Sequence, residues 1–164
     1  MSDTTKIRYE IDLATALPGQ AREDVTIRSL DPSDRDGLAH LMLDAYLGTI
    51  DYEGETLAEA IGEVDSWLEG TPMLDHSFGV VTDGQLVSAV LVSTIDHVPL
   101  IGYVMTDAEH KASGLGGAVT RSGLASLKSS GYSHVVLYIT KGNTPSERLF
   151  AGLGATTPNA DKRP

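Results

Sequence analysis

The spacing of apolar positions predicts a chain of short strands and amphipathic helices. Residues 25–30 alternate between apolar and polar side chains, which indicates a half-buried strand. After a turn at Asp31-Pro-Ser-Asp34, apolar residues recur every three or four positions as far as Tyr46, which predicts a helix. A second helix is predicted over residues 56–69, beyond a glycine-containing interruption. The chain therefore opens with one strand followed by two helices.

The second helix is predicted to turn an aliphatic face inward. That face carries Leu57, Ile61, Val64 and Leu68, and Trp67 lies in the same helix. Its acidic residues are expected on the outer, solvated face: Glu59, Glu63, Asp65 and Glu69.

The middle of the chain predicts a β-hairpin and a third strand. Asp83-Gly84 separates the apolar runs 78–82 and 85–95, and Asp-Gly between two such runs is a strong hairpin signal. Residues 100–106 continue as a strand. A helical pattern then begins after Gly117 and runs to about Ser130. Together these segments predict antiparallel pairing that leads into a helix.

The last third of the chain predicts a buried strand over 134–140 and a short helix to about Ala151, with Pro145 in its first turn. A helix that joins strands 100–106 and 134–140 implies a parallel pair with a right-handed crossover. The fold class is therefore α/β (α+β): a single domain with a mixed, mostly antiparallel sheet flanked by helices.

The predicted domain covers residues 25–157, with an N-terminal extension over 1–24 and a tail over 158–164. Within the extension, residues 7–13 alternate over a few positions, as in a short strand. Two outcomes stay open for this segment: it packs on the domain or pairs with a sheet edge, or its first residues are disordered.

Composition narrows the class of protein. The 164 residues carry a net charge of −11, which argues against nucleic acid as the main partner. There is no run of 18 apolar residues to span a membrane and no apolar segment at the polar N-terminus, so we expect a cytoplasmic protein. Cysteine is absent and the histidines lack metal-ligand spacing, so no metal is expected.

Charge is distributed unevenly along the sequence. Residues 36–110 contain fourteen Asp and Glu and no Lys or Arg, whereas residues 111–164 contain seven Lys and Arg and two acids. A basic C-terminal part suits an anionic cofactor, and an acidic middle suits a cationic acceptor. The alternative is that the acidic surface only keeps the protein soluble.

Glycines cluster where the strand 100–106 gives way to the following helix. Gly114-Leu-Gly-Gly117 leaves backbone N–H groups uncovered at a helix N-terminus, and such groups bind anions such as a pyrophosphate. Ser113 can cap the helix or add a hydroxyl donor. The spacing fits neither a P-loop nor a dinucleotide-binding fingerprint. A turn that only eases the chain into the helix is the structural alternative.

Two segments resemble the GCN5-related N-acetyltransferase family. Lys111-x-x-Gly114-x-Gly116 after a strand is similar to the family signature Gln/Arg-x-x-Gly-x-Gly/Ala, with Lys111 in place of Gln or Arg. The stretch from Asn143 to Gly154 resembles the family's closing segment: Asn, a short helix, then Leu-aromatic-x-x-x-Gly. Phe150 stands where the family often has Tyr.

The resemblance implies an N-acetyltransferase that moves the acetyl group of acetyl-CoA directly to a primary amine of a small molecule or a protein, and it makes a homodimer plausible. A parallel, splayed strand pair would form the cofactor site: the pantetheine arm would pair with the strand before the loop, and the pyrophosphate would sit on the loop. The implied cofactor-binding residues are Val104, Met105, Thr106, Lys111, Ala112, Ser113, Gly114, Leu115, Gly116, Gly117, Asn143 and Ser146.

The catalytic residues are less defined by the resemblance. The N–H near Met105 would polarise the thioester carbonyl. No carboxylate lies between Pro99 and Met105, where the family often has its base, so the candidates are His97, with Asp96 beside it, and Glu53. The loop that borders the acceptor site in the family corresponds here to Tyr46, Asp51, Tyr52 and Glu53.

Phe150 cannot donate a proton to the departing thiolate, which leaves Tyr103, Tyr138, Ser146 or water for that role. Two other functions therefore stay open: a non-catalytic acyl-CoA sensor of the same fold, and an unrelated nucleotide-binding module that uses the same loop. The segment that begins at Asn143 argues against the second of these.

Overall fold

The computed structural model describes residues 5–15, 24–47, 53–111 and 113–157. Six strands form one sheet: β1 (Lys6–Asp12), β2 (Thr26–Ser29), β3 (Phe78–Thr82), β4 (Gln85–Ile95), β5 (Val98–Thr106) and β6 (His134–Thr140). The helices in the described ranges are α1 (Arg35–Tyr46), α2 (Leu57–Glu69), α3 (Leu115–Ser129) and α4 (Thr144–Gly152), with short 3-10 turns between elements. The predicted mixed α/β architecture is confirmed.

The sequence signals at element ends act as expected. Asp83 and Gly84 both adopt positive φ, 50° and 77°, which is the conformation a two-residue hairpin turn requires. Thr56 caps α2 in a capping box with Glu59. Asn143 caps α4, whose first turn contains a proline. These local devices explain why the predicted boundaries of the hairpin and of α2 lie close to the observed ones.

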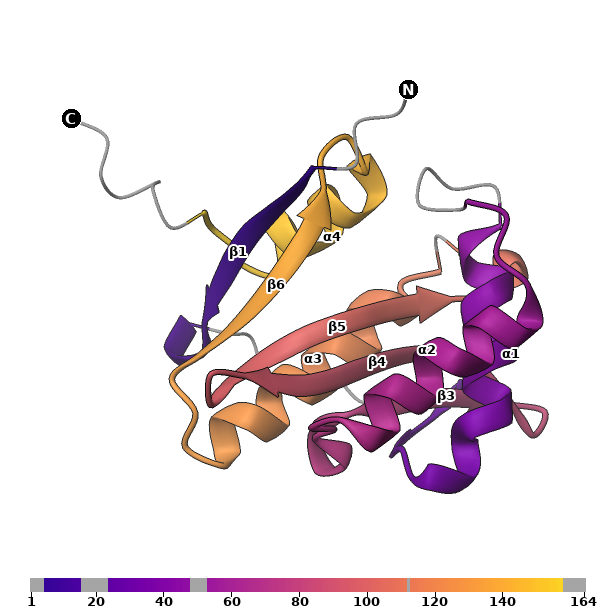
Figure 1. Cartoon of the computed structure of the whole chain (residues 1–164). Helices are drawn as coiled ribbons and strands as arrows, with labels where there is room; N and C mark the ends of the chain where they lie inside the picture. Colours follow the sequence, from indigo (N-terminus) through magenta and orange to yellow (C-terminus); the bar gives the residue numbers. More distant parts are fainter. Residues whose placement is uncertain (1–4, 16–23, 48–52, 112, 158–164) are drawn as a thin grey trace.

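The sheet has the order β1-β6-β5-β4-β3-β2, and its one parallel pair is β5 with β6. Helices α1 and α2 cover one face of the sheet and α3 covers the other, while α4 lies beside β6 (Figure 1). The parallel pair is joined through α3, as the crossover argument predicted.

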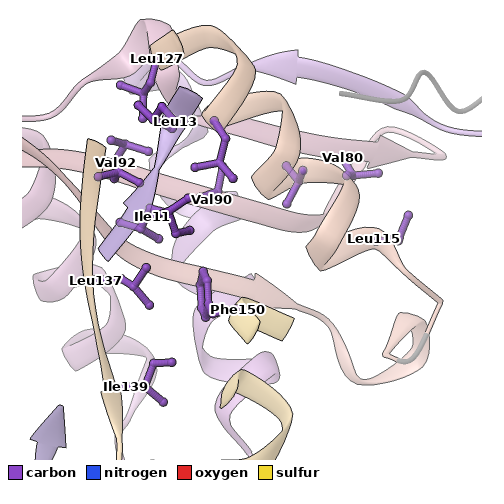
Figure 2. Close-up of a cluster of buried hydrophobic side chains, with 14 of the residues drawn as sticks. Ile11, Leu13, Val80, Val90, Val92, Leu115, Leu127, Leu137, Ile139 and Phe150 are labelled. Carbon is purple, nitrogen blue, oxygen red and sulfur yellow. The ribbon is translucent and has the colours of Figure 1, made fainter. Parts of the chain in front are cut away.

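Each face of the sheet buries its own apolar cluster. On the α3 side, Val90 and Val92 of β4 share a cluster with Leu127 of α3 and Phe150 of α4 (Figure 2). On the other side, residues of α1 and α2 pack on β4 and β5, and Leu91 of β4 is fully buried there. Two helix layers thus hold a sheet that is buried on both faces, which explains the nearly continuous apolar run in β4.

The N-terminal segment is part of the sheet. β1 pairs with β6 along its whole length, antiparallel, from Lys6 opposite Thr140 to Asp12 opposite His134. On its other side, Glu10 exchanges two backbone bonds of 2.8 and 2.9 Å with Thr156. Of the two outcomes left open for this segment, pairing with a sheet edge is confirmed.

Helix α2 turns inward much as predicted, with its most buried positions shifted toward Trp67. Val64 is buried, and Leu57, Ile61 and Leu68 are partly buried against the core. Ala60, Val64 and Trp67 are its buried residues, and the Trp67 indole N–H donates to the Val92 carbonyl over 3.0 Å. The large indole ring needs both burial and a hydrogen-bond partner, and this sets the face that turns inward. Glu59 and Glu63 are exposed, as predicted, and both also line a cavity.

Among the described residues, no helix combines the length and apolar character needed to cross a membrane.

Candidate active site

A β-bulge in the middle of β5 shapes the site. Leu91 of β4 lies opposite Tyr103 but its neighbour Val92 lies opposite Ile101, so Gly102 is the extra residue on β5. A bulge bends its strand and increases the local twist, and glycine inside a strand often marks one. The pairing of β5 with β6 stops at the same level, with Ile101 opposite Leu137 as the last pair. The bulge therefore marks the point where β5 leaves β6.

A cavity of about 480 Å³ opens where the two strands separate. Gly102, Tyr103 and Val104 of β5 form one wall, and Tyr138 and Thr140 of β6 form the opposite wall. The backbone of β5 beyond Ile101 has no register partner in β6, so its edge on that side is free to bond a ligand in an extended conformation.

The glycine loop lies beyond the C-terminal end of β5. Gly114 adopts φ of 81°, which glycine reaches without a steric penalty, and it forms the N-cap of α3. The Ala118 N–H donates to the Gly114 carbonyl over 3.0 Å, which is the first hydrogen bond within the helix. The N–H groups of residues 115–117 come before it and therefore have no acceptor within the helix. They supply the uncovered donors that an anion site needs.

Gly116 brings this helix terminus close to β5 and α4. A Cβ atom on Gly116 would lie 3.4 Å from Thr106 Oγ1, 3.7 Å from Val104 Cγ1 and 4.0 Å from a Leu149 methyl. The free donors of α3 and the free edge of β5 therefore adjoin one another, at the carboxyl ends of the parallel strands where such sheets bind ligands.

Two side chains of the predicted loop hold the loop itself. Lys111 Nζ donates to the Ala45 carbonyl over 2.6 Å, which ties the loop to the C-terminal end of α1. The Ser113 hydroxyl donates to the His110 carbonyl within the loop. Ala112, also expected at the cofactor, lies outside the described residues.

The free N–H groups on β5 are offset by one residue from the prediction. The Asp107 N–H donates to Val87 of β4 over 2.9 Å, and the Met105 carbonyl accepts from Ser88 of β4 over 2.8 Å. Because N–H groups two residues apart face the same side of a strand, that of Met105 also faces β4. The donors that face the split are those of Val104 and Thr106.

Asn143 and Ser146 line the cavity from α4. The Asn143 side chain accepts from the Ser146 N–H over 3.3 Å, which is the capping arrangement, and capping and ligand contact are compatible roles. Phe150 is 6% exposed and belongs to the apolar cluster on the α3 side of the sheet. Because the ring is packed in the core, the fold does not need the hydroxyl group that a Tyr would carry at this position.

The residues predicted at the acceptor side divide into three groups. Tyr46 and Glu53 line the cavity. Asp51 and Tyr52 lie outside the described residues. His97 is exposed in the tight turn between β4 and β5, with φ of 66°, at the opposite end of β5 from the glycine loop. The structure therefore brings Glu53 to the cavity but not His97.

Glu63, which the sequence analysis assigned to solvent, lies on the cavity wall. Its Oε2 accepts the hydroxyl proton of Tyr103 over 2.6 Å. Burial, and then the bond to Glu63, raises the pKa of Tyr103, so this phenol remains a donor. Glu53, Glu55 and Glu59 line the same cavity, and Lys6 lies on its β1 side. Within the described ranges, no group of three or more His, Cys, Asp or Glu is placed to hold a metal ion.

Comparison with known proteins gives the same family from sequence and from structure. The model of the FR47-like protein family matches residues 78–163. A mycothiol acetyltransferase of Actinosynnema mirum is 28% identical over 144 residues, 85% of this chain and 47% of that protein. The mycothiol acetyltransferase of Thermobispora bispora is 46% identical over 55 residues, 33% of this chain and 19% of that protein. The chain thus spans at most about half the length of these curated relatives.

Solved structures support the fold. A GCN5-related N-acetyltransferase from Sphaerobacter thermophilus superposes with a TM-score of 0.73 at 16% identity, over 93% of this chain and 48% of that chain. The PaiA N-acetyltransferase of Thermoplasma acidophilum in complex with coenzyme A gives 0.62 at 15% identity, over 78% of this chain and 87% of that chain. Together with the FR47-like match, the split sheet and the glycine loop, these likenesses establish that the chain belongs to the GCN5-related N-acetyltransferase family.

Proposed function

We propose that this domain binds acetyl-CoA and transfers its acetyl group to a primary amine in a ternary complex. The observation that carries the proposal is the adjacency of the split between β5 and β6 to the N-terminus of α3. An extended ligand with a diphosphate near one end fits such a site: the arm would bond the free edge of β5 and the diphosphate would accept from residues 115–117. The complex of the Thermoplasma acidophilum protein with coenzyme A supports this ligand.

The cofactor contacts divide between backbone and side chains. Val104 and Thr106 offer N–H groups toward the split, and we assign to Val104 the donor that polarises the thioester carbonyl. Ser146 and Asn143 would contact the arm from α4. Lys111 acts in this proposal by holding the loop on α1, whereas the phosphate contacts come from the main chain.

The acceptor is a cationic amine in this proposal. Four carboxylates line the cavity on the side of α2, and they favour a protonated nitrogen over a neutral or anionic group: Glu53, Glu55, Glu59 and Glu63. The cytoplasmic location and the homodimer expected from the sequence stay predictions.

A non-catalytic acyl-CoA sensor is the second candidate. Two observations favour it: Phe150 is a core residue that cannot donate a proton, and no carboxylate lies on β5 between Pro99 and Met105. Both functions require acetyl-CoA binding, and only the transferase releases free thiol when an amine is added.

Calorimetric titration with acetyl-CoA tests whether the protein binds this ligand, which both candidate functions require. We expect Gly116→Leu to weaken acetyl-CoA binding at least tenfold, because its side chain would grow from a Cβ 3.4 Å from Thr106 into the space between loop and strand. The matched control is Gly62→Leu on α2, where a Cβ meets no atom within 4 Å. Both variants keep an ordinary helical φ, so both should fold.

Micromolar binding by the wild-type protein and by Gly62→Leu, lost in Gly116→Leu, supports the cofactor site. No binding by the wild-type protein overturns the proposal. Competition separates the ligands: free CoA should displace acetyl-CoA and ATP should not, and displacement by ATP alone would indicate a general nucleotide site instead.

A further inference from the structure

We propose that Glu63 accepts the proton of the acceptor amine, and that Tyr103 is the positioning residue that holds Glu63 in place. The inference rests on the proposed transferase function and assigns a base that β5 itself does not supply. It starts from one contact, the 2.6 Å hydrogen bond from the Tyr103 hydroxyl to Glu63 Oε2, made between two residues that line the cavity.

The position of Tyr103 connects the contact to the proposed chemistry. Tyr103 lies on β5 between the bulged Gly102 and Val104, whose N–H faces the split. Its side chain packs against the apolar cluster under α1 and α2. A carboxylate bound to this phenol is therefore held over the stretch of β5 where the strand leaves β6 and the thioester would lie.

The hydrogen bond from Tyr103 leaves Glu63 able to accept a proton from the amine. An ionised carboxylate can accept about four hydrogen bonds, and the contact with Tyr103 uses one oxygen, Oε2. An O–H···O⁻ bond of this length is of the strong, charge-assisted kind and restricts an otherwise mobile side chain on an exposed helix face. Oε1 can then receive an N–H of the incoming amine.

Two of the other carboxylates in the cavity bond to backbone N–H groups. Glu55 accepts from the Glu53 N–H over 2.8 Å, and Glu59 Oε1 accepts from the Thr56 N–H over 3.3 Å in the capping box of α2. These contacts stabilise the chain near the start of α2. Glu63, in contrast, is held by a side chain from the strand that borders the split.

The proposed step balances as follows. An ammonium acceptor gives one proton to Glu63, which passes it to solvent. The neutral nitrogen then attacks the thioester carbonyl carbon, the C–N bond forms and the C–S bond breaks. The second proton leaves the nitrogen through Glu63 and ends on the coenzyme A thiolate. The products are the acetylated amine, the free thiol and one released proton.

The test measures thiol release from acetyl-CoA with spermidine, a lysine amide and a peptide with a free N-terminus, beside calorimetric binding of acetyl-CoA. Glu63→Gln keeps an oxygen for Tyr103 but cannot take the proton, so we expect kcat/KM to fall by about 10²–10⁴-fold with an unchanged Kd for acetyl-CoA. Glu69→Gln, an exposed glutamate at the end of the same helix, is the control and should leave both quantities unchanged.

Tyr103→Phe separates positioning from a merely structural role. In the wild-type background it should lower kcat about tenfold or more, because a bond to a charged group is lost. In the Glu63→Gln background it should add little, since the two residues act as a unit. Equal losses in both backgrounds would overturn the role of Tyr103.

Wild-type activity in Glu63→Gln would overturn the base assignment. Acetyl-CoA binding without thiol release from any amine would overturn this inference and favour the sensor, whereas absence of acetyl-CoA binding would remove the proposed function itself.

Discussion

Asp34 shows how one carboxylate fastens β2 to the start of α1. Arg28 donates to its two oxygens over 2.8 and 2.9 Å, and the Asp31 N–H donates to Oδ2 over 3.0 Å. The hydrogen bond from Arg28 is the largest of the causes that lower the pKa of Asp34, and burial opposes it. A lowered carboxylate pKa means that the folded state binds the ionised form more favourably than the unfolded state does.

We predict that Asp34→Asn lowers the free energy of unfolding at pH 7 by about 1 kcal/mol, a value kept small because Arg28 is partly solvated. The contribution is fully present above the unfolded pKa of about 3.9 and is lost as pH falls through the lower folded pKa. Urea unfolding between pH 7 and pH 3 should therefore show the two proteins converging in acid.

Asp36→Asn is the matched control, because the Asp36 side chain is 78% exposed and its ion pair with Arg35 is also at the surface. Its unfolding free energy should stay close to that of the wild-type protein at every pH. A constant difference between Asp34→Asn and wild type from pH 7 to pH 3 would contradict the linkage argument.

At single residues, sequence reasoning identified which residues lie near the site better than it identified where their side chains and N–H groups point. Lys111 stays a predicted cofactor residue, and its long side chain donates to the Ala45 carbonyl. Met105 was expected to turn an N–H toward the ligand, and strand alternation turns the N–H of its neighbour Val104 toward the split. Both outcomes depend on tertiary contacts that no local pattern in the sequence encodes.

At the scale of elements, Ser77 connects the end of the turn at Leu74–His76 to β4. It is fully buried, its hydroxyl donates to the Met73 carbonyl over 2.9 Å, and its oxygen accepts the Val92 N–H over 2.9 Å. Val92 is one of the two β4 residues that flank the bulge opposite Gly102. The contact thus supplies an acceptor where the regular ladder is interrupted.

We predict that Ser77→Ala costs about 1–3 kcal/mol of stability, because it leaves the buried Val92 N–H without its acceptor. Urea unfolding followed by the fluorescence of Trp67, the single tryptophan, measures the change. Ser66→Ala on the exposed side of α2 is the control and should be neutral or slightly stabilising. Equal stabilities for Ser77→Ala and wild type would show that this bond is dispensable.

Helices and strands that are specified by neighbouring residues could be predicted from the sequence. How these elements pack on one another was harder to predict. Asp83-Gly84, the Thr56 cap and the apolar run 134–140 each specify an element through neighbouring residues. The orientation of α2 depends on the hydrogen bond from the Trp67 indole to the carbonyl of Val92 on β4, 25 residues away in sequence. The sequence analysis placed Glu63 on the exposed face correctly, but the periodicity of the helix could not show the cavity beside it.

At the scale of the whole molecule, β1 anchors the edge of the sheet to the core through one fully buried side chain. Ile11 has no exposed surface and belongs to the cluster that includes Val90 and Leu137 (Figure 2). We predict that Ile11→Ala lowers the free energy of unfolding by about 2–5 kcal/mol, through lost burial and the remaining cavity.

The control for Ile11→Ala is Ile95→Ala at the end of β4, where the side chain is 40% exposed. It should cost clearly less in the same urea titration. A cost for Ile11→Ala no larger than that for Ile95→Ala would mean that β1 is detached from the sheet in solution.

The split between β5 and β6 was expected from the family resemblance, but the bulge that accompanies it was not visible in the sequence. A single glycine, Gly102, inside an otherwise regular strand gives no sign of its opposite partner, and a bulge is defined only by the register with β4. The glycine loop was predictable because several of its determinants lie together in sequence, from Lys111 to Gly117.

The pairing of β1 with β6 also sets an order of events during synthesis. Residues 6–12 leave the ribosome well before their partner strand, residues 134–140, has been made. Until then the apolar side of β1 has no sheet to cover it, and closing so long a loop carries an entropic cost. The β6 wall of the cavity, which β1 supports, therefore forms only after residues 134–140 have been made, later than the sheet of β2 to β5.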